Sequence, residues 1–455
     1  MKLKNTLILL VIFIILGAYV YFVEIKKHRK DEQVEKESKK VFTLVKDSIN
    51  TLIFKNLSQE FSLKKEQNEW KITHPLETEA DNSTINSMLT SLINAEKDKV
   101  FNVMPKDLFQ FGLDKRSTVI QVSVTTGESD SIRIGDDTPV GSYVFAYKKD
   151  STVFTINRSV KNSFNKKLFD IRDRQLLHFI RTDVRYLSLM RESGKIEFEK
   201  SEGSDWIIPS INRPADNSKI SSILSKLENN KAKAFVDEQG TQLKKYGLHK
   251  PTYQVELLLG PEKGQKRLFI SNSLNGKYYA KDETRKPIFE IDSALVKDIK
   301  QKLTDFRSKD FASFDRNEVN RIVVQYGDTL FTCLKDSANI WYLDDSTHQM
   351  VKSSEITSFF SSLDYTNISD FVKDENFDVK RYGLDKPSLK LSLYKDDELL
   401  IEATLGNEKE NKIYAITNQI NSLYLIPSSK LEDLKLKLDN IIEAPEEAES
   451  EEEIS

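Results

Sequence analysis

Three copies of one sequence pattern lie along this chain of 455 residues. Three tryptophans at nearly constant spacing (206−70 = 136 and 341−206 = 135) mark the pattern: Trp70, Trp206 and Trp341. Three glycines, each followed by leucine, repeat at almost the same intervals (247−112 = 135 and 383−247 = 136): Gly112, Gly247 and Gly383. Similarity at a fixed period indicates that one structural unit was copied in tandem. At roughly 150 residues per domain, the chain length independently predicts three domains.

Each copy begins with strand-like segments and then carries one amphipathic helix. Segments such as 195–200 alternate apolar and charged residues, which is typical of a strand, and they lead to the tryptophan. In the helix, apolar residues recur at i, i+3, i+4 and i+7, which predicts one buried face. The three sets are Ile85, Met88, Leu89 and Leu92; Ile220, Ile223, Leu224 and Leu227; and Ile356, Phe359, Phe360 and Leu363. Candidate N-caps are Asn82 or Ser83, Asn217 or Ser218, and Ser353 or Ser354.

The Gly-Leu motif of each copy predicts a tight turn that leads into a strand. An aromatic residue precedes each glycine, and Pro251 and Pro387 follow shortly after the glycine in the second and third copies. Glycine tolerates a positive φ, and proline cannot continue a helix. Arg116 replaces the proline in the first copy, which predicts a looser turn there. We expect strands next, at 118–124, 253–259 and 389–394, and closing helices at 160–168, 294–303 and 429–438.

These elements predict an α+β fold of three tandem homologous modules, built from antiparallel strands with helices and preceded by one N-terminal transmembrane helix. We place a membrane anchor at 1–25, a charged stalk at 26–48 and an acidic disordered tail at 442–455. The modules occupy 49–178, 179–314 and 315–441.

The predicted anchor rests on an uncharged apolar segment, 7–23. Its length is at the lower limit for crossing a bilayer, and the residues after Gly17-Ala18 make a poor signal-peptidase site. Lysines and Arg29 flank the segment, and counted alone they would keep the modules in the cytoplasm. Long domains translocate largely regardless of such charges. We expect a single-pass protein of the cytoplasmic membrane with most of the chain outside the cytoplasm; a cytoplasm-facing tethered scaffold is the alternative.

Composition and motifs argue against several classes of function. The 68 basic and 71 acidic residues nearly balance, whereas nucleic-acid-binding domains are usually basic. The single cysteine, Cys333, excludes an internal disulfide, and it falls in a strand-like run as a small buried side chain would. The five histidines are scattered, which argues against a zinc site. No phosphate-binding, dinucleotide-binding or serine-hydrolase motif occurs, so we assign no catalytic, cofactor-binding or metal-binding residue.

Two pairs of polar residues recur between copies. Asp81 and Asp216 precede the helix in an Ala-Asp-Asn-Ser motif that the third copy lacks. They are candidates for a helix cap or for a binding site. Arg172 and Arg307 lie between successive modules, one repeat length apart (307−172 = 135). The third module has no module after it and lacks this arginine. We therefore interpret Arg172 and Arg307 as contacts between modules.

The three copies resemble the bacterial domain-of-unknown-function family numbered 4340. The resemblance rests on the short apolar motif that begins with Trp, the Ala-Asp helix start and the aromatic-Gly-Leu turn. It extends from about residue 50 to 440. The second copy matches best, through Trp206, Pro209, Ala215-Asp216, Tyr246-Gly-Leu248 and Pro251. The resemblance implies a single-pass envelope protein that accompanies ABC transporter subunits similar to gliding-motility exporters. It implies no catalytic residue.

We therefore expect a membrane-anchored extracytoplasmic binding or scaffold protein, accessory to an ABC-type transporter complex, with an unidentified ligand. Repetition favours this class because linked modules raise the effective concentration of a second contact. An envelope hydrolase with a site between modules is the alternative, and a pocket with convergent acids or an activated nucleophile in one module would favour it.

Overall fold

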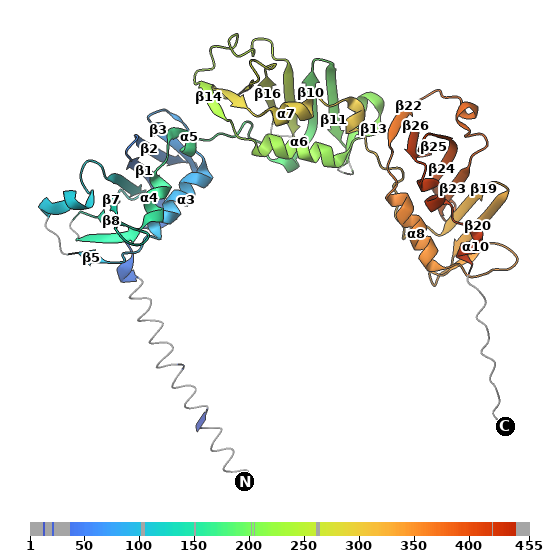
Figure 1. Ribbon diagram of the computed structural model, residues 1–455, viewed down its shortest axis with the longest axis horizontal. Coiled ribbons are helices and arrows are strands. Elements are labelled where there is room, and N and C mark those ends of the chain that lie inside the picture. Colours follow the sequence, from blue (N-terminus) through green and yellow to red (C-terminus); the bar gives the residue numbers. More distant parts are fainter. Residues whose placement is uncertain are drawn as a thin grey trace, which may run out of the picture. The chain divides into compact units, whose positions relative to one another are not determined.

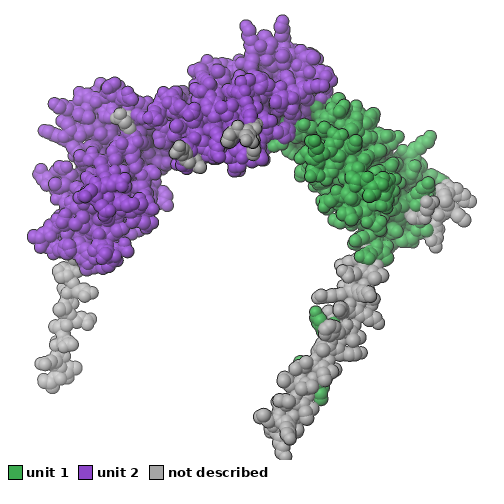
Figure 2. Space-filling view, turned by 180° about the vertical axis from the view of Figure 1, so that it is seen from behind, with its two compact units in different colours: residues 1–175, 231–234 green, residues 176–230, 235–455 purple. Residues whose placement is uncertain are grey.

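The computed structural model describes residues 12–13, 21, 37–101, 105–149, 152–201, 203, 205–260, 264–420 and 422–442. Within them, three antiparallel sheets follow one another along the chain (Figure 1). Contacts divide the chain into two compact units, residues 1–175 with 231–234 and residues 176–230 with 235–455, which Figure 2 colours green and purple. The first sheet belongs to the first unit, and nearly all of the other two sheets belongs to the second.

The first sheet has nine strands in the order β4-β3-β2-β1-β6-β7-β8-β9-β5. The strands are β1 (Ile49–Lys55), β2 (Glu60–Glu66), β3 (Glu69–His74), β4 (Thr78–Glu79), β5 (Val100–Phe101), β6 (Thr118–Val124), β7 (Ser129–Asp137), β8 (Tyr143–Tyr147) and β9 (Val153–Asn157). Consecutive hairpins account for most neighbours, and the pairing of β1 with β6 joins the strands before the long helix to those after it.

The second sheet repeats this order as β13-β12-β11-β10-β15-β16-β17-β18-β14. Its strands are β10 (Val184–Arg191), β11 (Gly194–Lys200), β12 (Trp206–Ile208), β13 (Arg213–Pro214), β14 (Ala234–Asp237), β15 (Tyr253–Leu259), β16 (Gln265–Ile270), β17 (Tyr278–Asp282) and β18 (Ile288–Ile291). Strand for strand, the connectivity is that of the first sheet, as the repeat predicts.

The third sheet has the same order without a counterpart of β4: β21-β20-β19-β23-β24-β25-β26-β22. Its strands are β19 (Arg321–Tyr326), β20 (Thr329–Lys335), β21 (Trp341–Leu343), β22 (Asp370–Lys373), β23 (Leu389–Lys395), β24 (Glu398–Lys409), β25 (Lys412–Thr417) and β26 (Leu423–Pro427). An isolated bridge between Tyr342 and Met350 takes the place of the missing edge strand.

One long helix packs against each sheet: α3 (Asn82–Ile93), α6 (Asn217–Asn229) and α8 (Ser353–Asp364). The buried residues of each helix are the four of its predicted apolar stripe. Burial of side chains of this size stabilises the fold by roughly 1.5–3 kcal/mol each. The predicted helical stripe is confirmed in every copy.

Of the cap candidates, Asp81 and Asp216 are the N-caps of α3 and α6, and Asn82, Ser83, Asn217 and Ser218 lie inside the helices. Lys352 precedes α8, one residue before the predicted Ser353 or Ser354. The asparagines at the second position have another role: Asn82 and Asn217 accept hydrogen bonds from the main chain of Trp70 and Trp206.

The helix that closes each module is interrupted where the sequence suggested one continuous helix. Two segments occur in each: α4 (Arg158–Phe164) and α5 (Leu168–Ile171), α7 (Ser293–Ile299) and the 3-10 helix η6 (Leu303–Phe306), and α9 (Lys430–Leu434) and α10 (Leu438–Ile441). In the first two modules an aspartate restarts the helix, because Asp170 and Asp305 accept the main-chain N–H of Lys167 and Lys302 at 2.8 and 2.9 Å.

Shorter 3-10 helices accompany the sheets: η2 (Lys46–Ser48), η3 (Pro105–Phe111), η4 (Arg181–Asp183), η5 (Pro209–Ile211) and η7 (Val379–Tyr382). The segment entering each module also joins its core. Val41 and Phe42 are buried in the first core, and Phe311 is buried in the third. The first and third modules therefore begin before the predicted boundaries at 49 and 315.

The predicted anchor at 7–23 lies, apart from Ile12, Phe13 and Tyr21, outside the described residues. Among the residues described, no helix has both the length and the apolar character that crossing a bilayer requires. The acidic tail from Glu443 onward also lies outside the described part of the chain.

Candidate functional site

The three tryptophans occupy equivalent buried places, with exposures of 2% for Trp70 and 5% for Trp206 and Trp341. Each pairs across the strands with a lysine that the sequence analysis did not single out: Lys65, Lys200 and Lys335. The ammonium groups of Lys200 and Lys335 lie 6.0 and 5.7 Å from the indole centroids. Because a lysine stem covers apolar surface while its charge reaches water, Lys200 and Lys335 shield their indoles. Their regular spacing (200−65 = 135 and 335−200 = 135) was the available signal.

Asp81 and Asp216 cap helices α3 and α6. Asp81 Oδ1 accepts the Thr84 N–H, and Asp216 Oδ1 accepts the Lys219 N–H, both at 3.0 Å. Lys352 stands at this place in the third module and makes no side-chain cap. The helix caps therefore use one oxygen of each aspartate.

The second oxygen of Asp81 forms an ion pair with Lys231, whose segment belongs to the same compact unit. The Lys231 ammonium lies 2.8 Å from Asp81 Oδ2. Burial acts to raise the pKa of Asp81, but the bonds from Lys231 and the Thr84 N–H outweigh it, so the pKa lies below its usual value. With both oxygens engaged, Asp81 serves a structural contact.

Hydrogen bonds connect the residue after each aspartate to the tryptophan strand. The side-chain oxygens of Asn82 and Asn217 accept the main-chain N–H of Trp70 and Trp206 at 2.8 and 2.9 Å. The Asn217 amide also donates to Asp205 at 2.8 Å. This arrangement explains why the Ala-Asp-Asn motif recurs: the aspartate caps the helix, and the asparagine connects the helix to the sheet.

The Gly-Leu motif forms the same turn in all three modules. The φ angles of Gly112, Gly247 and Gly383 are 65°, 67° and 72°, in the left-handed region that favours glycine. The first copy retains this conformation without the proline, because the Asp114 carboxylate accepts the Arg116 N–H at 2.9 Å. The looser turn predicted there does not occur at the glycine.

Arg307 is a buried arginine of the second module that contacts the third. Its side chain is 2% exposed, and Nη1 lies 2.8 Å from Asp374 Oδ1. Nη2 donates to Ser422 Oγ at 3.2 Å, and the guanidinium carbon lies 3.6 Å from the Phe371 ring centroid. Desolvation lowers the pKa of Arg307, and Asp374 opposes this effect.

The main chain around Arg307 continues the connection between these two modules. Arg307 forms a β-bridge with Ala215 of its own module, and Asp310 forms one with Asn367 of the next. Arg213 Nε adds a second bond to Ser422 Oγ at 3.2 Å. Arg172 holds the equivalent main-chain position, bridging to Ala80, and its side chain is also 2% exposed.

Cys333 and the histidines are the side chains of this chain most able to act as a nucleophile or a general base. Cys333 is fully buried on β20, and burial raises its pKa to about 12, so its thiol is protonated at neutral pH. His74, His249 and His348 are exposed, and His178 is half-buried. His28 lies outside the described residues.

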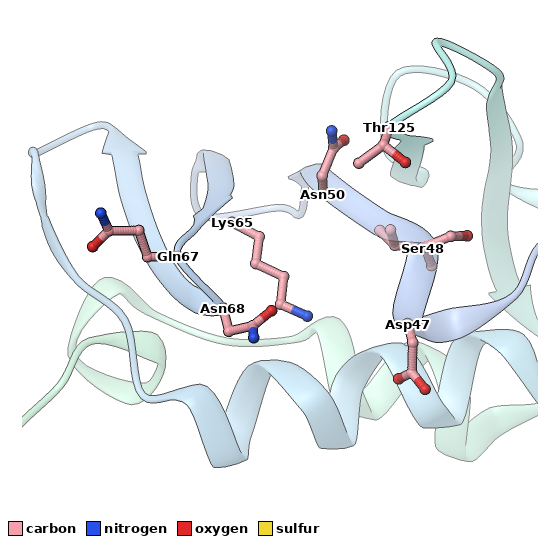
Figure 3. A pocket seen from close by; sticks show the side chains of 8 residues that line it. Asp47, Ser48, Asn50, Lys65, Gln67, Asn68 and Thr125 are labelled. Atoms are coloured by element: carbon pink, nitrogen blue, oxygen red, sulfur yellow. The ribbon is translucent and has the colours of Figure 1, made fainter.

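A polar cavity of about 450 Å³ opens at one end of the first sheet (Figure 3). Figure 3 shows Lys65 extending beside Asn68 into the space next to the turn that carries Asp47 and Ser48. The lining residues are Asp47, Ser48, Ile49, Asn50, Lys65, Gln67, Asn68 and Thr125. Gln67 and Asn68 both have positive φ, 48° and 69°, as in the two-residue turns that tightly close a hairpin.

The lining of this cavity suits the binding of a polar solute. One carboxylate, one ammonium and several amides and hydroxyls can hydrogen-bond a polar solute, and Ile49 contributes the apolar lining residue. The cavity is a candidate site for a small polar ligand in the first module.

Repeated sheets with one long helix and one left-handed glycine turn define a tandem α+β repeat protein. The model of the family described as Domain of unknown function (DUF4340) matches the chain three times, at residues 70–213, 206–378 and 341–445. These matches cover most of the chain, and the protein belongs to this family. No curated protein and no solved structure matches the chain.

Proposed function

We propose that this protein is a membrane-anchored extracytoplasmic binding or scaffold protein that assists an ABC-type transporter complex of the gliding-motility or export kind. The binding role is supported by one observation: the same module occurs three times, and its equivalent turns expose different side chains. Three linked modules can contact a partner together, and linkage multiplies weak affinities. The apolar segment at 7–23 supports the anchor.

The exposed turns support this proposal because their backbone conformation is the same in the three modules, whereas their exposed side chains differ. Tyr246 and Leu248 of the second turn are buried, and the lysines beside them are exposed. A scaffold of this kind can present a separate contact on each module without changing its core. A single catalytic centre would not require the repetition.

The location and the partner can be tested together in cells of the native host. We expect protease added to spheroplasts to digest the modules of the full-length chain, and crosslinking followed by mass spectrometry to recover transporter subunits. A cytoplasmic protein of known abundance serves as the control for intact cells. Modules that stay protected until the membrane is dissolved, with no transporter subunit recovered, would refute the proposal and favour a cytoplasm-facing scaffold.

A further inference from the structure

The Gly-Leu turn of the second module is basic, whereas the equivalent turns are not. The ten residues 241–250 contain Lys244, Lys245, Lys250 and His249 and no acidic residue. The equivalent residues 106–115 contain two lysines and two aspartates. Residues 377–386 contain three basic and two acidic residues. Because all three turns share the left-handed glycine, the fold does not require this concentration of positive charge.

The basic side chains of this turn face solvent. Tyr246 and Leu248 point into a small core with Ile288, while Lys244, Lys245, His249 and Lys250 are exposed. The Lys245 ammonium lies 5.1 Å from the Tyr246 ring centroid. Within the part of the chain that the structure describes, none of these three lysines forms an ion pair.

A second segment extends the positive charge. Gly240, just before the turn, lies against the main-chain carbonyl of Lys286, whose side chain is also exposed and makes no ion pair with a described residue. The nearby Asp237 carboxylate is occupied by the main-chain N–H groups of Gln239 and Gln242, at 3.1 and 2.8 Å. We call Lys244, Lys245, Lys250 and Lys286 the basic strip.

The second module has a net positive charge, and the rest of the chain after it has a net negative charge. Residues 179–314 contain 25 basic and 19 acidic residues, a net charge of +6. Residues 315–455 contain 15 basic and 29 acidic residues, a net charge of −14. Half of that excess is the tail 443–455, which has seven glutamates and no basic residue.

We infer that the basic strip binds an acidic, extended peptide, and that the acidic tail of this chain, from the same or a second copy, is its occupant. Lysines gathered on one turn repel one another, and a polyanion relieves that repulsion. Tethering favours the tail over free peptides, because a linked segment has an effective concentration of up to about millimolar.

The test measures binding of a fluorescent synthetic peptide with the sequence of residues 443–455 to the full-length protein in detergent. The receptor carries Gln at all seven tail glutamates, so that its own tail does not compete. We expect saturable binding at low salt that weakens steeply as salt is added, and at least tenfold weaker binding for the receptor with K244E/K245E/K250E.

A matched control separates the strip from general charge. The triple substitution K55E/K99E/K115E reverses three exposed lysines of the first module and changes the net charge by the same amount. We expect this control to weaken peptide binding less than twofold. Circular dichroism checks that both receptors remain folded.

Three outcomes would overturn the inference. The peptide could fail to bind the receptor at low salt, or the two triple substitutions could weaken binding equally. The strip could instead bind vesicles of anionic phospholipid while failing to bind the peptide, which would assign it to a membrane surface.

Discussion

At the residue scale, burial decides the role of each group that carries chemistry. Cys333 is enclosed by the third core, and Arg307 is buried with a carboxylate, a hydroxyl and an aromatic ring around it. The Asp81 carboxylate is occupied by a helix N-terminus and a lysine. These contacts give all three residues structural roles.

The buried thiol makes stability depend on pH. Cys333 has a pKa of about 12 in the folded protein, above its ordinary value of about 8.5 in an unfolded chain. The unfolded state therefore loses this proton first, and stability from this group is complete below about pH 8.5 and falls as pH rises toward 12. We expect urea unfolding at pH 7 and pH 10 to show a larger loss for the wild type than for Cys333→Val.

Labelling of the thiol provides a second measurement. Native protein should resist iodoacetamide at pH 8, and unfolded protein should react at once. Rapid labelling of the native protein would contradict the buried position of Cys333.

Close approach of two main-chain segments makes Gly406 irreplaceable. A Cβ at Gly406 would lie 2.1 Å from the Tyr382 carbonyl oxygen, so Gly406→Ala must displace the turn. We expect a loss of about 2–3 kcal/mol in urea unfolding, a typical cost of overpacking. Gly264→Ala is the control: it has a positive φ and open space around it, and it should cost only about 1 kcal/mol. Equal losses would refute the role of the close approach.

At the element scale, the helices were predictable and their ends were not. Apolar periodicity identified the buried residues of α3, α6 and α8, because a helix that packs on a sheet buries a stripe of period 3.6. The sequence left neighbouring cap candidates for α3 and α6, because aspartate and asparagine are equally good caps and only tertiary contacts draw Asn82 and Asn217 to the tryptophan strand.

The break in each closing helix was also missed. The breaks at 165–167 and 300–302 contain neither proline nor glycine, and the restart depends on a local hydrogen bond that Asp170 or Asp305 accepts. The lysines that cover the indoles could have been found from their spacing, whereas the partners of Arg307 come from far along the chain and required the structure.

The difference between caps predicts a difference between modules. Asp216→Ala should destabilise the second module by about 1 kcal/mol, because the Lys219 N–H loses its acceptor. Lys352→Ala should cost less than half as much, since this residue provides no side-chain cap. Hydrogen exchange at the first turns of α6 and α8 measures both effects separately. Equal increases in exchange would argue against the cap assignment.

At the scale of the whole molecule, the repeat determines the architecture and the joints determine how modules connect. The second and third modules are joined by a linker that forms β-bridges on both sides, with Arg307 buried between them. Arg307 contributes an ion pair, a hydrogen bond and a ring contact to this joint.

Loss of Arg307 should loosen this joint. Arg307→Ala removes charge-assisted bonds to Asp374 and Ser422, and we expect a loss of about 2 kcal/mol in urea unfolding. Trypsin should also cleave faster at Lys309. Arg307→Lys should restore little, because lysine lacks the planar fork. Arg185→Ala, at an exposed site, is the control; if it and Arg307→Ala behave alike, the joint does not depend on this arginine.

The central claim is that one fold, closed around its own tryptophan, occurs three times. Three variants that each keep one tryptophan, with phenylalanine at the other two sites, allow each indole to be measured by fluorescence emission and acrylamide quenching. We predict blue-shifted, poorly quenched emission from Trp70, Trp206 and Trp341 alike, since all are at most 5% exposed. Red-shifted, readily quenched emission from any one of them in a folded variant would contradict the claim.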